Sequence, residues 1–271
     1  MARVPLLRRL FVFRIDAIAH LKDAAIRDYV YTQIITANHS TKQTVAGRFR
    51  DLDEATISCM HKESLNVIHD IAVSSGVTSL ELFRTLHSRG LPVSVHISDK
   101  YARYGTTGRT LVRVVDADGA LVEMYACGIL AKSDLSQKFW LSRLLYSLLA
   151  GKSRNHKLKW FLLFDPQVME NIEQGLIHFI DYDVFETRET SRFTFVRCMN
   201  LLNLNYFSSD KIEGALRNIV GSLKEDGILQ IGRTTLDGHN MVGFYINTRS
   251  GLRLVREVGG GTELRDVLKK F

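Results

Sequence analysis

The chain has 271 residues, of which 45% are hydrophobic, and its 36 basic and 29 acidic residues give a formal net charge of +7. This apolar content is enough for a large folded domain, and 3 prolines without any low-complexity tract argue against a disordered chain. No apolar run reaches the roughly 18 residues that a membrane-spanning helix needs. The three cysteines, Cys59, Cys127 and Cys198, lie far apart and lack a CxxC pattern, which favours a reducing cytoplasm over a disulfide framework.

Residues 1–62 are predicted to form a helical segment. Apolar residues recur every three or four positions in "LKDAAIRDYVYTQII" (21–35), and "DLDEATISCMHKES" (51–64) starts with acidic residues that suit a helix N-terminus. The first residues share the basic start of a signal peptide, but Arg14 and Asp16 interrupt the apolar run that follows. We therefore interpret this start as an amphipathic helix that belongs to the fold.

Strands and helices alternate from residue 63 to the end of the chain, apart from an insertion at about 101–173. Strands are predicted at 66–73, 91–99, 175–185, 192–202 and 228–234, and helices at 78–90 and 208–227. Helices of this length between strands imply right-handed crossovers, so we expect an α/β fold with a doubly wound, Rossmann-like and mostly parallel sheet. Strands at 240–248 and 251–258, joined by "RSG", predict a terminal antiparallel hairpin.

The insertion at about 101–173 is predicted to cap the site of the sheet. Its stretch "TLVRVVDADGALVEMYACGI" (110–129) predicts a hairpin around "DADG", and 138–160 predicts an apolar helix with a basic tail. Seven basic residues and one acidic residue lie between Lys132 and Lys159, a local excess of six that nearly equals the charge of the whole chain.

Three interpretations of residues 139–160 remain open. Aromatic and leucine residues beside lysine and arginine fit peripheral contact with an anionic membrane surface. They also fit a lid over a hydrophobic or acidic substrate, or a buried amphipathic helix with a solvated basic turn. No recognisable nucleic-acid-binding module accompanies the segment, which argues against nucleic acid as the partner. The oligomeric state cannot be read from these patterns.

The loop "AVSSGV" (72–77) follows the first predicted strand of the sheet. In open parallel sheets, ligands bind beyond the carboxyl ends of the strands at the point where the strand order reverses. Small residues let the backbone approach a ligand, Ser74 and Ser75 add hydroxyls, and the next helix offers unpaired N–H groups. One glycine in place of G-x-G-x-x-G suits a ligand without phosphates, such as S-adenosylmethionine, better than a dinucleotide. An ordinary strand-to-helix turn is the alternative.

Acidic residues stand at the ends of the next two predicted strands. Asp99 lies 23 residues after Gly76, where a carboxylate can accept both hydroxyls of a cofactor ribose. Asp181 and Asp183 follow the third strand, where a carboxylate could take the adenine amino group. The alternative for Asp99 and Asp183 is that each caps a turn or a helix.

The two stretches "AVSSGVTSLEL" and "FVRCMNLLNLNYFSSDKIEGALRNIVGSLKEDGILQIGRT" together resemble class I S-adenosylmethionine-dependent methyltransferases, in particular the chemotaxis-receptor type. The first is similar to that group's A-x-S-[ST]-G loop, and the second to its fourth-strand segment with an Arg/Asn pair leading to Tyr-Phe. The resemblance covers roughly residues 64–100 and 174–235 and implies the same cofactor. The cofactor-binding residues expected from the strand ends and the resemblance are Asp70, Ala72, Ser74, Ser75, Gly76, Asp99, Asp181, Asp183, Val184, Asn200 and Leu201.

The chain also departs from that family pattern. Two additional residues stand between Asn200 and Tyr206, and Val77 and Thr78 replace the acidic residues that usually follow the loop glycine. The insertion matches no motif of the receptor enzymes' peptide-binding subdomain. The resemblance therefore bears on the cofactor, and methylation of receptor glutamates is not inferred.

Two residues are candidates for the proton transfer that a hydroxyl or amine acceptor needs. His239 lies in "RTTLDGHN", just past the fifth strand, and Tyr206 follows the fourth. An exposed polar surface residue is the alternative for His239, and no metal-ligand spacing is found. The predicted activity is methyl transfer to a small-molecule or glycan/lipid-linked acceptor. The alternative is a catalytically inactive S-adenosylmethionine-binding regulatory or scaffold protein, since the same sheet hosts many activities.

Overall fold

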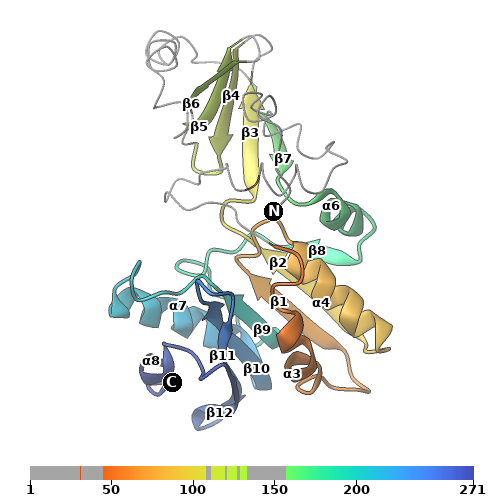
Figure 1. Ribbon diagram of the computed structural model, residues 1–271, viewed down its shortest axis with the longest axis vertical. Helices are drawn as coiled ribbons and strands as arrows, with labels where there is room; N and C mark the ends of the chain where they lie inside the picture. The colour runs from red at the N-terminus through yellow and green to blue at the C-terminus, as the bar shows by residue number, and fades with distance from the viewer. Residues whose placement is uncertain (1–30, 32–44, 108–110, 120, 127–128, 133–156) are drawn as a thin grey trace. The chain divides into compact units, whose positions relative to one another are not determined.

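The computed structural model describes residues 31, 45–107, 111–119, 121–126, 129–132 and 157–271 (Figure 1). The chain divides into two compact units, one containing residues 45–100 and 170–271 and the other containing the insertion 101–169. Apart from Tyr31, the predicted helix at 21–35 lies outside the described residues, as does the predicted helix up to residue 156. Among the described residues, no helix has the length and apolar character needed to cross a membrane.

The first unit contains a seven-stranded sheet with the order β8-β2-β1-β9-β10-β11-β12. These strands are β1 (Asn66–Ile71), β2 (Val93–Ser98), β8 (Ile177–Phe179), β9 (Phe193–Met199), β10 (Leu223–Thr234), β11 (Asn240–Thr248) and β12 (Gly251–Val258). The first five are parallel to one another, whereas β11 is antiparallel to β10 and forms the antiparallel hairpin with β12. Counted along the chain, the order is 3-2-1-4-5-6-7, which is that of a doubly wound sheet. The predicted Rossmann-like, mostly parallel sheet with a terminal hairpin is confirmed.

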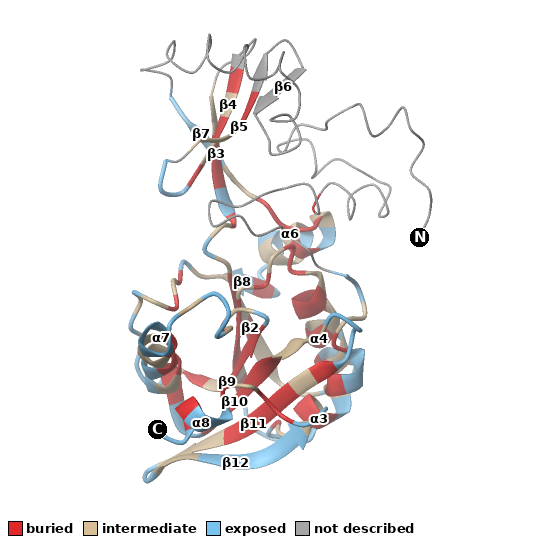
Figure 2. Cartoon of the chain, turned by 60° about the vertical axis from the view of Figure 1, so that its left-hand side comes forward, coloured by how far each residue is buried: buried red, intermediate tan, exposed pale blue. Residues whose placement is uncertain are grey.

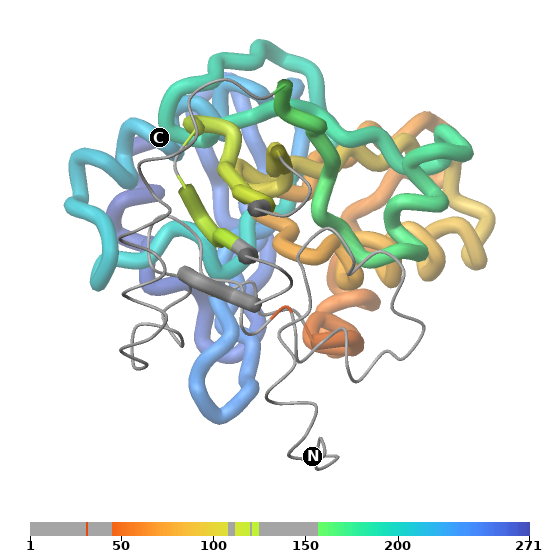
Figure 3. The backbone as a smooth tube through the Cα atoms, turned by 90° about the horizontal axis from the view of Figure 1, so that it is seen from above, coloured from red at the N-terminus to blue at the C-terminus, as the bar shows by residue number. Residues whose placement is uncertain are grey.

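Helices cover both faces of this sheet. The crossover helix α4 (Val77–Ser88) follows β1, and α7 (Ser209–Ser222) follows β9. Because the strand order reverses between these strands, right-handed crossovers place α4 and α7 on opposite faces (Figure 3). The inner strands are mostly buried, whereas the edge strand β12 is largely exposed (Figure 2). The shorter helices of this unit are η2 (Arg50–Leu52), α3 (Asp53–Ile57) and α8 (Arg265–Leu268), and α6 (Pro166–Glu173) spans the boundary between the units.

The sequence pattern explains where α7 begins but not where it ends. The Ser208 hydroxyl accepts a hydrogen bond from the Lys211 N–H at 3.4 Å and caps the first turn. The predicted helix end at Gly227 is wrong, because the helix stops at Ser222 and Leu223 is extended, with ψ of 141°. Leu223 is buried in the core, and Asp226, with φ of +61°, turns the chain back into the strand. The helix propensity of "LKED" therefore does not decide where α7 ends, because the chain joins the sheet at Leu223, which pairs with Phe193 of β9.

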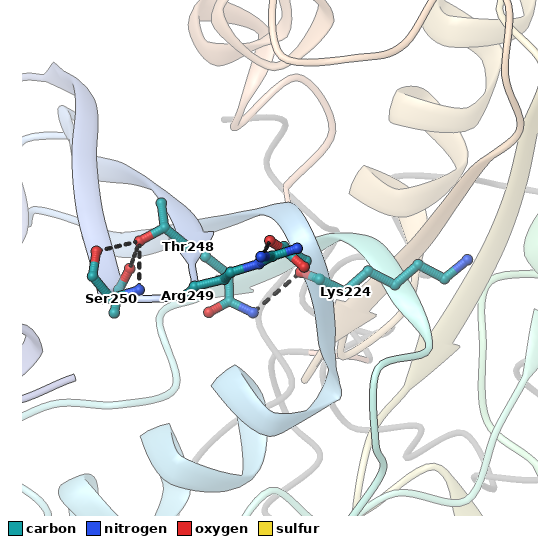
Figure 4. Close-up of polar contacts among 7 residues, drawn as sticks. Lys224, Thr248, Arg249 and Ser250 are labelled. Atoms are coloured by element: carbon teal, nitrogen blue, oxygen red, sulfur yellow. Dashed lines mark hydrogen bonds and ion pairs between the residues drawn. The ribbon is translucent and has the colours of Figure 1, made fainter.

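Hydrogen bonds from the β11–β12 hairpin fix this early start of β10. The Asn247 side-chain amide donates to the carbonyls of Leu223 and Lys224, and Arg249 pairs with Glu225 (Figure 4). The predicted strand at 175–185 is also shorter than expected, since β8 covers three residues. The chain turns at Asp183, whose carbonyl accepts the N–H groups of residues 186 and 187.

The insertion forms a second, antiparallel sheet with the order β6-β5-β4-β3-β7. Its strands are β3 (Arg103–Thr107), β4 (Leu111–Asp116), β5 (Leu121–Ala126), β6 (Ile129–Lys132) and β7 (Lys159–Leu162). The hairpin predicted around "DADG" is confirmed, with Gly119 N–H donating to the Asp116 carbonyl at 3.1 Å. The predicted helical tail is wrong at its end, because Lys159 and Trp160 lie in β7, where they pair with β3.

Candidate functional site

The loop after β1 has an unusual backbone. The strand order reverses between β1 and β9, so the carboxyl ends of these strands frame the crevice where such sheets bind ligands. Ala72, Ser74 and Gly76 have φ of +60°, +57° and +80°. A residue with a Cβ atom in this left-handed region costs about 1–2 kcal/mol, and such strain concentrates at ligand sites. Two of the five residues 72–76, Ala72 and Ser74, are strained in this way, which favours a ligand-binding loop over a plain strand-to-helix connection.

The end of β2 holds this loop in place. Val73 N–H donates to the Ser98 carbonyl at 3.2 Å, and Ser74 N–H donates to Asp99 Oδ2 at 2.8 Å. Asp99 therefore lies directly beside the loop, as the sequence predicts. The Ser74 hydroxyl oxygen is buried and has no hydrogen-bond partner in the described part of the chain. Such a group costs about 1–3 kcal/mol, a penalty that a polar ligand atom could remove.

Asp70 supports the loop from below. Its Oδ1 accepts from Arg197 Nε at 2.9 Å, and its Oδ2 accepts from Arg197 Nη2 at 2.5 Å and from the Ser79 hydroxyl at 2.6 Å. The Arg197 and Asp70 side chains are 2% and 5% exposed. Both carboxylate oxygens thus have protein donors, and Asp70 ties β9 to the first turns of α4. The carboxylate that the sequence assigns to the cofactor is an anchor of the site in this structure.

The three candidate residues after β8 differ in their surroundings. Asp183 accepts from Lys100 Nζ at 2.7 Å and from Phe185 N–H at 3.0 Å, which is the turn-capping alternative for this residue. Val184 is buried in the core beneath α7. Asp181 is exposed at the same strand end. Of the two acids predicted near the adenine, Asp181 is therefore the one that faces solvent.

Asn200 joins the carboxyl ends of β9 and β10. It has φ of +59°, and its Oδ1 accepts the Thr234 N–H at 2.7 Å while its Nδ2 donates to the Thr234 hydroxyl at 3.4 Å. The Thr234 hydroxyl donates in turn to Asn240 Oδ1 at 2.9 Å. The next residue, Leu201, packs against the core. Asn200 is exposed and lies at the same reversal point as the loop after β1.

The two candidate bases lie in neighbouring turns at the ends of β9 and β10. Tyr206 is 80% exposed, and His239 is exposed in a turn closed by hydrogen bonds with Thr235. Two other titratable groups near the site are excluded as bases by burial. Burial lowers the pKa of His69 to about 3 and raises the pKa of the Cys198 thiol to about 12.

A cavity of about 200 Å³ adjoins α4, the helix that follows the loop, and was not foreseen from the sequence. It is lined by Gly47, Phe49, Arg50, Asp53, Thr78, Glu81, Arg84 and Thr85. One wall is closed by Glu81, whose two carboxylate oxygens accept the Gly47 N–H at 2.8 and 2.9 Å. Burial raises the pKa of Asp53, and the Arg197 charge opposes that rise. The available signals were "RFRD" (48–51) ahead of the first strand and the helical spacing of Thr78, Glu81 and Thr85.

The sequence matches no protein-family model, and a search of curated proteins finds no match. Among solved structures, the chain is similar to an S-adenosyl-L-methionine-dependent methyltransferase from Methanococcus maripaludis (13% identity, TM-score 0.35, 69% of this chain and 55% of that one). It is also similar to the CMeT domain of the citrinin polyketide synthase (13% identity, TM-score 0.38, 77% of this chain and 39% of that one). A third similar structure is the Burkholderia thailandensis 1,6-didemethyltoxoflavin-N1-methyltransferase with bound S-adenosylhomocysteine (12% identity, TM-score 0.40, 83% of this chain and 66% of that one). The chain spans about half the length or less of the first two, and no residue role is transferred from any of them.

The chemical character of the site follows from its own residues. Within the described parts of the chain, no group of three or more His, Cys, Asp or Glu side chains is arranged to hold a metal ion. The site offers a strained loop with an unpartnered hydroxyl, a carboxylate at the end of β2, and a cavity lined by charges of both signs. This combination suits a ligand with sugar hydroxyls and a zwitterionic end.

Proposed function

We propose that the protein is an S-adenosylmethionine-dependent methyltransferase. The observation that carries the proposal is the loop after β1, where the buried Ser74 hydroxyl lacks a partner and Asp99 stands within hydrogen-bond distance of the loop backbone. The cofactor carries its methyl group on a sulfonium sulfur. When the methyl group is transferred, the sulfur leaves as a neutral thioether and needs neither a proton nor a metal. The resemblance to the chemotaxis-receptor type supports this cofactor loop and does not extend to the substrate.

Each part of the cofactor has a complementary group in the proposed site. The loop 72–76 lies along the methionine part, Asp99 accepts the ribose hydroxyls, and Asp181 takes the adenine amino group. The cavity of about 200 Å³ is smaller than the roughly 300–1,000 Å³ of a whole ligand site, so it suits one end of the cofactor. Its guanidinium groups, Arg50 and Arg84, complement a carboxylate, and Asp53 complements an ammonium group.

The acceptor side of the proposed site is apolar. Leu204, Tyr206 and Leu236 are 46%, 80% and 107% exposed, and all three lie in the turns that follow β9 and β10. These exposed side chains support an apolar small-molecule or glycan/lipid-linked acceptor. The chain's main contribution to catalysis is to orient donor and acceptor, and Tyr206 or His239 removes a proton where the acceptor carries one.

The test is calorimetric titration with S-adenosylhomocysteine. We expect wild-type protein to bind, and Asp99→Ala to weaken binding at least about tenfold, or about 1.4 kcal/mol. Asp266→Ala is the matched control, because Asp266 is 90% exposed on α8 and its carboxylate pairs with the exposed Lys269. Absence of any heat or thermal shift with wild-type protein would overturn the proposal.

The alternative function is a cofactor-binding regulatory or scaffold protein without transferase activity. The exposure of both candidate bases favours it, since neither Tyr206 nor His239 is held toward the loop by a hydrogen bond of its side chain in the described structure. Incubation with methyl-labelled donor and a panel of amphiphilic hydroxyl and amine acceptors separates the two functions. Binding with no label transferred to any acceptor supports the alternative.

A further inference from the structure

Residues Gly47–Leu52, which we call the strap, form one wall of the cavity. The Phe49 ring is 8% exposed, and the Arg197 guanidinium lies 5.2 Å from its centroid, so the strap covers the buried ion pair beneath the loop. Main-chain bonds inside the strap are local, such as Leu52 N–H to the Phe49 carbonyl at 2.9 Å. Its position over the cavity therefore depends on what holds it from outside.

Asn240 holds the strap from the sheet side. It is the first residue of β11 and is 3% exposed. Its amide nitrogen donates to the Arg48 carbonyl at 2.9 Å and to Asp51 Oδ1 at 2.7 Å, while its oxygen accepts from the Thr234 hydroxyl. The bond to a carboxylate belongs to the stronger, charge-assisted class. An amide is needed here, because the side chain must donate two hydrogen bonds and accept one.

Glu81 holds the strap from the helix side. It lies in the second turn of α4, and both carboxylate oxygens converge on the single Gly47 N–H. Together with the Asn200–Thr234 bonds, these contacts form a continuous chain from the end of β9, through β10, β11 and the strap, to α4. The two sides of the crevice are thus connected through the strap.

We propose that Asn240 and Glu81 are positioning residues that keep the strap closed over the amino-acid end of the cofactor. The inference rests on the proposed function. Glu81 acts by accepting a hydrogen bond from Gly47, so its charge is not required. Asn240 acts by donating to the strap, so a side chain of the same shape that cannot donate will release it.

The first experiment uses Asn240→Asp, which replaces both donors by a carboxylate facing Asp51. Two adjacent carboxylates repel, and one shared proton restores a hydrogen bond between them, so the defect must depend on pH. Relative to wild type at the same pH, we expect S-adenosylhomocysteine to bind at least about tenfold more weakly at pH 8 and within about threefold at pH 5.5. Without ligand at pH 8, the strap amides of Asn240→Asp should exchange hydrogen about tenfold faster than those of wild-type protein.

The matched control is Asn247→Asp, the same substitution on the same strand. Asn247 lies at the other end of β11, where its amide donates to the carbonyls of Leu223 and Lys224, in the cluster of Figure 4. This variant should leave ligand affinity and strap exchange unchanged. An equal loss of affinity in both variants would mean that any disturbance of β11 has this effect, which would overturn the role of Asn240.

A second pair of variants tests Glu81 and guards against a misfolded Asn240 variant. Glu81→Gln keeps an acceptor for the Gly47 N–H and should retain affinity within about threefold, whereas Glu81→Ala should lose about tenfold. If Gln loses as much as Ala, Glu81 acts through its charge and the positioning role is wrong. Failure of wild-type protein to bind S-adenosylhomocysteine overturns the proposed function. Unchanged strap exchange in Asn240→Asp overturns this inference independently of any ligand.

Discussion

Replacing Arg197 by leucine should destabilise the Rossmann-like unit severely. The substitution removes a guanidinium that is 2% exposed and leaves the Asp70 carboxylate, 5% exposed, with the Ser79 hydroxyl as its remaining side-chain donor. It also removes the cation under the Phe49 ring of the strap. Arg197 and Asp70 are direct partners of neighbouring parallel strands, so backbone movement cannot bring a new partner without breaking the sheet.

The magnitude follows from the burial of the pair. Breaking a buried ion pair by removing one partner costs about 3–5 kcal/mol, because it leaves an uncompensated charge away from water. Loss of the cation–π contact adds about 2 kcal/mol, because both groups are buried. The total is a large part of the roughly 5–15 kcal/mol that stabilises a typical domain. By contrast, Arg217→Leu breaks a pair with Glu213 in which Arg217 is 70% exposed, and should cost less than about 0.5 kcal/mol.

The assay must report on this unit alone. Both tryptophans, Trp140 and Trp160, lie in the insertion, so tryptophan fluorescence would follow the wrong unit. Urea unfolding should instead be followed by hydrogen exchange in peptides from β1 and β9. In an Asp70→Asn background the cost of Arg197→Leu should fall by at least about 1.5 kcal/mol, since no buried anion is then left unpaired. A cost below about 1 kcal/mol, or the same cost in both backgrounds, would refute the anchoring role.

Two further predictions concern stability. Because burial lowers the pKa of His69 to about 3, below the roughly 6.5 of an unfolded histidine, the contribution of His69 to stability should be fully present above pH 6.5 and fall by about 1.4 kcal/mol per pH unit between pH 6.5 and 3. His96, whose pKa burial lowers to about 4, should add to this decline. Urea unfolding between pH 7.5 and 5 should show this decline, and His69→Phe should make it shallower; equal slopes would contradict the assignment. A Cβ atom on Gly232 would lie 2.1 Å from a backbone oxygen of β11, whereas one on Gly214 in α7 meets nothing within 4 Å. Thermal unfolding should therefore show that Gly232→Ala is destabilised by about 1–3 kcal/mol or more. Gly214→Ala should be stabilised by up to about 1 kcal/mol. The opposite order of stabilities would contradict this packing.

Local patterns were sufficient for the type of sheet and for part of the candidate site. The alternation of strands and helices predicts parallel crossovers, and the short link "RSG" predicts a hairpin, because both depend on residues close together in the chain. The position of Asp99 beside the loop could be predicted for the same reason. Parallel neighbouring strands bring their carboxyl ends to one edge, so a residue that ends one strand lies near the loop that follows the next.

Partners that lie far apart in the sequence were decided by the tertiary structure. Asp70 has the sequence position of a cofactor ligand, but the register of β1 against β9 gives its carboxylate to Arg197, 127 residues away. The strap and Asn240 are 192 residues apart at their Arg48 contact, and no local pattern indicates that they meet. The helix α7 likewise ends where Leu223 joins the sheet beside Phe193, 30 residues earlier in the chain, although its own sequence would continue the helix. Hydrophobic periodicity specifies which face of an element is buried, whereas the residue that each polar group meets depends on strand register and helix packing, which are set only when the whole chain has folded.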